Sequence, residues 1–135
     1  MPVFSADPAR IDVALVHRWL SEESYWAKGR PRATQDVAMA GSRNYGVYDE
    51  ATGAQLAYAR VVTDGALFAW LCDVFVAPSV RGTGAGKLLL QGVLDDLEPL
   101  GLKRMLLATA DAQELYRRFG FAELSGEMAW MIRQS

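Results

Sequence analysis

Apolar residues recur at two spacings along the chain, and each spacing predicts a different kind of element. Near the start, Ile11, Leu15 and Trp19 repeat every fourth position, which is the period of an amphipathic helix. From Asn44 to Val76, apolar runs are separated by turn residues, and this pattern predicts an antiparallel β-meander. Its last run, Ala66 to Val76, is nearly continuous in apolar residues, so we expect a strand that is buried on both faces.

The remainder of the chain alternates between helical and strand-like patterns. A helix is predicted to follow the glycines at 82–86 and to stop at Pro99, a short strand covers Lys103 to Thr109, and a second helix covers 112–119. At the end of the chain Met128, Trp130 and Ile132 alternate with less apolar positions, which predicts a last strand. Together with an opening strand over Pro2 to Ala6, a first helix and a second helix capped by Thr34, this order predicts one α/β (α+β) domain over residues 1–135. Its central sheet is expected to be mixed, mostly antiparallel and flanked by helices.

Charge, cysteine and histidine content narrow the function. Fourteen basic and sixteen acidic residues give a net charge of -2, which does not suit a nucleic-acid partner held by a general positive field. With Cys72 as its one cysteine and His17 as its one histidine, the chain has too few ligands for a zinc site of the usual kind, and no metal is expected. Cys72 is expected to pack in the core and His17 to lie on the surface.

The expected environment is the cytoplasm. The opening residues lack the pattern of a signal peptide, and no run approaches eighteen apolar residues, so no membrane partner is expected. A monomer and a homodimer are both open. Met128, Trp130 and Ile132 would serve either as a dimer seam or, more simply, as the core-facing side of the last strand.

The most informative segment is a glycine-rich turn between the meander and the following helix. Gly82, Gly84 and Gly86 open that helix, where unpaired backbone N–H groups are able to bind an anion; the simpler alternative is a turn that only connects two elements. A nucleotide-binding P-loop does not fit, because Arg81 stands at its first glycine and Leu88 at its magnesium-binding hydroxyl. The dinucleotide fingerprint does not fit either.

A different family pattern fits this segment and one further downstream. Arg81-x-x-Gly84-x-Gly86, placed after the strand end Val74-Phe75-Val76, resembles the pyrophosphate-binding motif of the Gcn5-related N-acetyltransferases, the GNAT family. The segment from Leu115-Tyr116 to Gly120-Phe121 resembles the second signature of that family, and the order of elements agrees over nearly the whole chain.

The resemblance implies an enzyme that uses acetyl-CoA as cosubstrate. Its expected reaction is transfer of the acetyl group to a primary amine of an unidentified small molecule, by direct attack in a ternary complex. Two alternatives remain open, namely a protein or peptide N-acetyltransferase and a non-catalytic acyl-CoA-binding module. The expected partner is therefore a small-molecule amine or a peptide acceptor.

The resemblance also assigns cofactor contacts to named positions. The pantetheine arm is expected between two splayed parallel strands that end at Val76 and Thr109, paired with the backbone of Val74, Phe75 and Val76. Thr109 replaces the asparagine of many relatives, so it or Asp111 is the expected contact there. The residues expected to hold the diphosphate are Arg81, Gly82, Thr83, Gly84, Ala85, Gly86 and Lys87.

Catalysis is expected to involve Tyr116 and Asp73. Tyr116 matches the tyrosine that relatives use as general acid, although it also fits simple packing. Asp73 lies within an apolar strand, where burial would raise its pKa towards that of a useful base; the alternative is a charge at a bulge. Tyr25, Trp26 and Arg30 are candidates for acceptor binding, and their basic neighbourhood is otherwise a solvated loop.

Overall fold

The computed structural model describes residues 1–135, and a five-stranded sheet in the order β1-β2-β3-β4-β5 forms its centre. Neighbours from β1 to β4 run antiparallel, whereas β4 and β5 run parallel, so the expected mixed sheet is confirmed. The strands are β1 (Pro2–Ser5), β2 (Arg43–Asp49), β3 (Gln55–Thr63), β4 (Phe68–Val76) and β5 (Arg104–Leu106).

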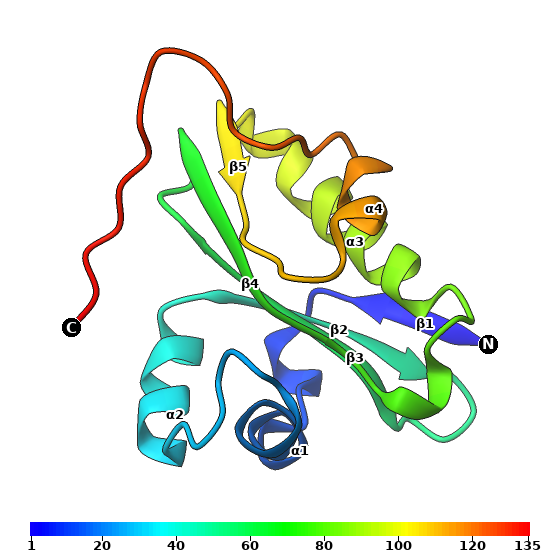
Figure 1. The fold of residues 1–135 in the computed structure, drawn as a ribbon. Coiled ribbons are helices and arrows are strands. Elements are labelled where there is room, and N and C mark those ends of the chain that lie inside the picture. The colour runs from blue at the N-terminus through cyan, green and yellow to red at the C-terminus, as the bar shows by residue number, and fades with distance from the viewer.

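Helices cover both faces of this sheet (Figure 1). They are α1 (Val13–Arg18), which continues into a π-helical turn (Trp19–Glu23), α2 (Arg32–Ala40), α3 (Ala85–Leu97) and α4 (Gln113–Arg117). Short 3₁₀ turns lie at Pro8–Arg10, Pro78–Val80 and Glu98–Leu100. The helices α1 and α2 lie on one face, α3 and α4 on the other, and no helix is long and apolar enough to cross a membrane.

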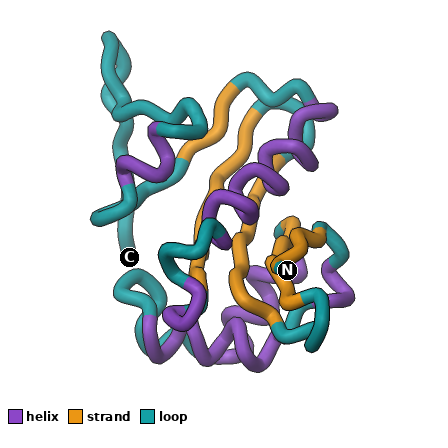
Figure 2. The backbone as a smooth tube through the Cα atoms, turned by 90° about the vertical axis from the view of Figure 1, so that its right-hand side faces the viewer, coloured by secondary structure: helices purple, strands orange, loops and turns teal.

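Two apolar clusters hold the layers together, one on each face of the sheet. The larger cluster joins α3, through residues such as Leu89 and Val93, to buried side chains of the central strands. Helix α3 also crosses close to β1, because a Cβ at Gly92 would lie 2.3 Å from the ring of Phe4. Figure 2 shows α3 extending along the strands. The smaller cluster packs α1 against Tyr58 and Phe75, and Phe75 stacks on Trp19.

A β-bulge interrupts β4 at Asp73. Tyr58 pairs with Phe75 and Arg60 with Cys72, so one extra residue is accommodated in β4 across from β3. Asp73 has a φ of 51°, the one non-glycine residue in the left-handed region, where aspartate is tolerated better than most residues. The bulge alternative for Asp73 is therefore the one observed.

The parallel pairing of β4 and β5 ends soon after it begins. It joins Phe68, Ala69 and Trp70 to Arg104, Met105 and Leu106, and does not extend beyond those residues. The backbone of β4 from Leu71 to Val76 consequently has no strand on its β5 side. The predicted splay of these two strands is present, although β5 is shorter than the expected 103–109.

Three sequence-based expectations are wrong. Met128, Trp130 and Ile132 form no strand: the chain beyond Phe121 runs outside the sheet, and its apolar side chains are exposed (Figure 1). Thr34 lies inside α2, which begins after Pro31. The apolar run 66–76 becomes a strand only at Phe68, because the Asp64 carboxylate accepts hydrogen bonds from the next backbone amides and holds a longer loop. That strand is also not buried on both faces, since buried side chains alternate with partly exposed ones along it.

Candidate active site

The glycine-rich turn presents a row of backbone amides at the start of α3. Gly84 has a φ of 92° and begins the helix without a side-chain cap. The N–H groups of Gly84, Ala85, Gly86 and Lys87 donate to no acceptor within the protein. Unpaired amides at the positive end of a thirteen-residue helix are well suited to a phosphate anion. These groups therefore fit a diphosphate such as that of CoA.

The turn opens into a cleft of about 700 Å³ that continues along β4. Most of the residues expected to contact the cofactor line it: Val74, Phe75, Val76, Arg81, Gly82, Gly84, Gly86 and Lys87. Thr83 and Ala85 do not, since the Thr83 hydroxyl donates to the carbonyl of Val80 and the Ala85 side chain is buried. At those two residues only the backbone is left to contact a ligand in the cleft.

Arg81 is held at the rim of this cleft. Its Nε donates to the carbonyl of Val76 at 3.0 Å, and its guanidinium carbon lies 5.3 Å from the centre of the Phe75 ring. The charge is thereby kept beside the unpaired edge of β4. Thr109 lies further along and accepts hydrogen bonds from the backbone N–H groups of Asp111 and Ala112. Its hydroxyl shapes the loop that leads into α4.

Tyr116 borders both this cleft and a neighbouring cavity. The neighbouring cavity, of about 520 Å³, is lined by β4, by the loop that follows β5 and by the loop before α2. Tyr116 is 8% exposed, and Tyr25, Trp26 and Val74 also line both spaces. Burial raises the pKa of Tyr116 to about 12, with Tyr25 and Asp111 adding to the rise, so the hydroxyl keeps its proton at neutral pH.

The wall of the neighbouring cavity carries a charged cluster centred on Asp73. Arg30 Nη1 and Arg60 Nε donate to Asp73 Oδ2 at 2.7 Å and 2.9 Å. Trp26 Nε1 donates to the other carboxylate oxygen at 3.0 Å. Three of the predicted site residues, Asp73, Trp26 and Arg30, are therefore brought together, and Asp73 is itself only 4% exposed.

The pKa expected for Asp73 is corrected by this cluster. Burial raises the pKa of the carboxyl, but the hydrogen bonds and charges of Arg30 and Arg60 outweigh burial, and the pKa is lowered from its ordinary value. The prediction of a raised pKa is wrong because it considered the apolar strand and not the two guanidinium groups. A carboxylate held in this state is a poor proton acceptor.

The loop before α2 is fixed by hydrogen bonds at both ends. Ser24 Oγ donates to the carbonyl of Leu20 and accepts from the N–H of Ala27. His17 Nε2 donates to the carbonyl of Arg30 at 2.7 Å, so His17 supports this loop and is not simply a surface residue. Tyr25 reaches across to the other side, where its hydroxyl accepts from the N–H of Ala110 at 3.0 Å. The candidate acceptor residues are therefore held in place.

Sequence reasoning missed Arg60, Gln35 and Ser42. Arg60 Nη1 donates to Ser42 Oγ at 3.0 Å, and the buried Gln35 accepts from Arg30 Nη1 at 2.8 Å. Arg60 carried a usable signal, since it is the one charged residue within strand β3 and apolar residues flank it on both sides. Gln35 and Ser42 carried none, because their role depends on where α2 packs. Cys72, expected in the core, is half-buried and lines the cavity, and burial raises its thiol pKa to about 11.

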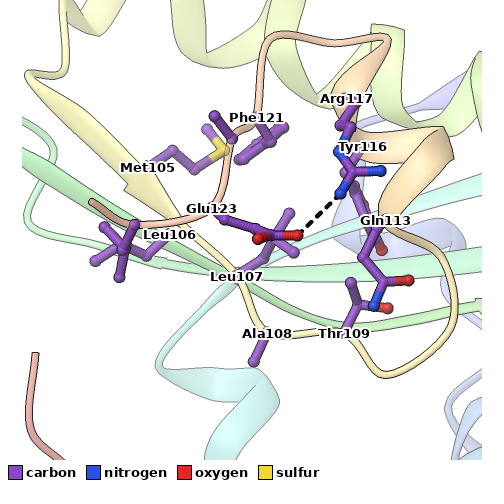
Figure 3. Close-up of a pocket in the computed structure, with 12 residues that line it drawn as sticks. Met105, Leu106, Leu107, Ala108, Thr109, Gln113, Tyr116, Arg117, Phe121 and Glu123 are labelled. Atoms are coloured by element: carbon purple, nitrogen blue, oxygen red, sulfur yellow. Dashed lines mark hydrogen bonds and ion pairs between the residues drawn. The ribbon is translucent and has the colours of Figure 1, made fainter.

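A further cavity of about 400 Å³ lies on another side of Tyr116, between β5 and α4 (Figure 3). Met105, Leu106 and Leu107 form one wall, and Tyr116 and Arg117 form the other. Arg117 Nη2 donates to Glu123 Oε1 at 2.9 Å across this space. The cavity is present because the chain after Phe121 does not pair with β5.

Comparisons with known proteins agree with this geometry. Residues 13–121 match the model of the acetyltransferase (GNAT) family. A provisionally named GNAT-family acetyltransferase of Xanthomonas campestris is 38% identical, with a TM-score of 0.85 and coverage of 96% of this chain and 94% of that one. A provisionally named acetyltransferase of Gibberella zeae is 29% identical over 130 residues, which are 83% of this chain and 73% of the fungal protein. A Mycobacterium tuberculosis protein solved in complex with CoA shares the fold, at 18% identity and a TM-score of 0.76 over 95% of this chain and 76% of that one. The chain belongs to the GNAT acetyltransferase family.

Proposed function

We propose that this protein transfers the acetyl group of acetyl-CoA to a primary amine of a small molecule, by direct attack within a ternary complex. The observation that carries the proposal is the position of Tyr116. Its side chain borders both the cleft at the glycine-rich turn and the cavity beside Asp73. A proton donor at the junction of two spaces suits a reaction between one reactant in each space.

The cosubstrate would be held mainly by backbone groups. The free amides from Gly84 to Lys87 would hold the diphosphate, with Arg81 supplying charge at the rim. The unpaired edge of β4 would hydrogen-bond an extended arm as an added strand does. When bound, acetyl-CoA supplies a thioester carbonyl to the junction. The backbone N–H near Phe75 would then stabilise the negative charge that develops on the carbonyl oxygen.

Tyr116 is the proposed general acid. The amine nitrogen would bond to the carbonyl carbon as the carbon–sulfur bond breaks, and the departing thiolate would take the Tyr116 proton. The nitrogen would then lose its second proton, which would return through water to restore the Tyr116 hydroxyl. A pKa of about 12 keeps that proton available over the physiological range. The amine must lose its own proton before attack. Asp73 is already committed to two guanidinium groups, so this proton is expected to leave through water at the mouth of the cavity.

Tyr25 and Trp26 are the proposed acceptor contacts beside Arg30. Their rings meet edge to face at 4.9 Å between centres, and both rings border the cavity and the cleft. The pair would exclude water from the side of the amine that faces the loop before α2. Because Tyr25 also accepts from Ala110, it would set the width of the opening between that loop and the loop after β5.

The substitution Tyr116→Phe tests this assignment. It keeps the ring against Phe121 and removes only the hydroxyl, so kcat should fall by about 10²–10⁴-fold while acetyl-CoA affinity stays nearly unchanged. The measurement is release of the CoA thiol with a panel of small amines, together with calorimetric titration of acetyl-CoA. An unchanged kcat under chemistry-limited turnover would assign Tyr116 to packing. A loss of affinity instead would make it a cofactor contact.

A further inference from the structure

The cluster around Asp73 contains more positive than negative charge. Arg30 uses Nη1 for Asp73 and Gln35, and Arg60 uses Nε for Asp73 and Nη1 for Ser42. The Nη2 groups of both arginines donate to no atom of the protein. Two guanidinium groups therefore share one carboxylate. One positive charge, both Nη2 groups and Nε of Arg30 remain without a protein partner.

These free donors adjoin the cavity and are not sealed in the core. The side chains of Arg30 and Arg60 are 21% and 14% exposed, and both residues line the space beside Tyr116. Asp73 cannot take a further donor easily, because both of its oxygens already accept hydrogen bonds from Trp26, Arg30 and Arg60. A partly desolvated positive charge of this kind is stabilised by an anion that enters from solution.

One more charged residue faces this cavity, and it has the opposite sign. Asp111, in the loop that follows β5, lines both the cavity and the adjoining cleft, and its carboxylate accepts no hydrogen bond from the protein. It lies close enough to Tyr116 to raise the pKa of that tyrosine. The cavity thus has free positive donors on the wall formed by Arg30 and Arg60, and a free negative group beside the proposed general acid.

We propose that the acceptor is a small amine that also carries a carboxylate group, of the amino-acid type, with its carboxylate held by Arg30 and Arg60. This inference rests on the proposed function and names the class of its acceptor. The ammonium end would lie near Asp111 and Tyr116, where the amine must lose its proton. The rest of the lining includes Trp26, Trp70 and Leu107, which suits an apolar side chain.

Guanidinium geometry supports a carboxylate in particular. The planar fork of arginine matches the two oxygens of a carboxylate, and each charge-assisted hydrogen bond is stronger than a neutral one. An otherwise identical amine without the carboxylate would leave the surplus charge without a partner. We therefore expect a preference of about 10- to 100-fold for the acceptor that has the carboxylate.

Binding to the CoA-saturated protein tests the proposal without requiring turnover. Matched pairs are titrated by calorimetry: phenylalanine against phenethylamine, leucine against isopentylamine, and phenylalanine against its amide. Each amino acid should bind at least about 10-fold more tightly than the matched compound without a free carboxylate. Equal or weaker binding of the acids, or no binding of any acid, would overturn the proposal. Thiol release with the same compounds reports separately on the proposed function, which survives if the amines lacking a carboxylate are acetylated as well.

Substitutions at the two arginines link the preference to this cluster. Arg60→Lys and Arg30→Lys each keep a positive charge beside Asp73 but lose the planar guanidinium fork. Each substitution should therefore reduce the ratio of acid affinity to amine affinity to about one tenth of its value in the native protein. The matched control is Arg32→Gln, because Arg32 pairs with Asp36 on the exposed surface and lies outside the cavity. A preference that persists in both lysine variants, with their melting temperatures unchanged, would contradict the assignment.

Discussion

The proposed cofactor side of Tyr116 offers backbone amides of one continuous turn, whereas the proposed acceptor side offers side chains from distant segments. The turn uses neighbouring residues from Gly84 to Lys87, so its geometry is local. The cluster around Asp73 joins Trp26, Arg30 and Arg60 to that carboxylate. These residues come from separate segments, and no regular spacing in the sequence indicates that they meet. A site made of backbone amides tolerates many substitutions of its side chains, whereas a site made of side chains depends on the identity of each residue.

The two sides therefore place different demands on the sequence. The amide row requires only glycines that permit a φ such as the 92° of Gly84. The cluster around Asp73 forms only where β3, β4 and the loop before α2 pack together. Substitutions in that cluster should therefore alter acceptor choice and stability together, while those in the turn should alter cofactor affinity alone.

Loss of the Asp73 carboxylate should have the largest effect on stability. Asp73→Ala leaves Arg30 and Arg60 facing each other in a partly buried site, so the free energy of unfolding should fall by about 3–5 kcal/mol. Urea unfolding measures the loss. The control is Asp36→Ala, which removes an exposed pair with Arg32 and should cost less than about 1 kcal/mol. Equal losses in the two variants would show that the cluster is no more important than a surface pair.

Cofactor binding should stabilise the fold by a smaller amount. At about 100 times its dissociation constant, acetyl-CoA should add about 2.7 kcal/mol, and the melting temperature should rise on the order of 10 °C. Gly84→Val should abolish that rise, because a side chain would stand between the amides and the diphosphate. The control is Gly65→Val, which carries the same positive-φ penalty in the loop between β3 and β4, at the opposite end of β4 from the glycine-rich turn. A normal rise in melting temperature with acetyl-CoA in the Gly84 variant would show that the turn does not bind the cofactor.

The dependence of stability on pH should show the smallest effect. The folded-state pKa of Asp73 is lowered, so its contribution to stability is complete above its unfolded pKa of about 4 and is lost as the pH falls through the folded value. The difference in unfolding free energy between the native protein and Asp73→Asn should therefore be constant from pH 7 to pH 5 and shrink below pH 4. A difference that instead changes between pH 5 and pH 7 would contradict the lowered pKa.

The sequence alone determined most of the elements and the position of the glycine-rich turn, because both depend on local patterns. Apolar runs separated by turn residues located β2 to β4, helical periodicity located α3, and the glycine spacing after β4 located the amide row. Tyr116 followed from its place in a short motif. Each of these features depends on residues that lie close together in the chain, so the pattern of one segment contains the information.

Only the tertiary structure decided the partners of Asp73 and the course of the end of the chain. The pKa of Asp73 depends on Arg30 and Arg60, which lie 43 and 13 residues away along the chain and meet it through packing of β3, β4 and the loop before α2. The alternation at Met128, Trp130 and Ile132 is typical of a strand, yet these residues form none, since a strand requires a paired neighbour as well as a pattern. Long-range contacts set both outcomes, and periodicity does not encode them.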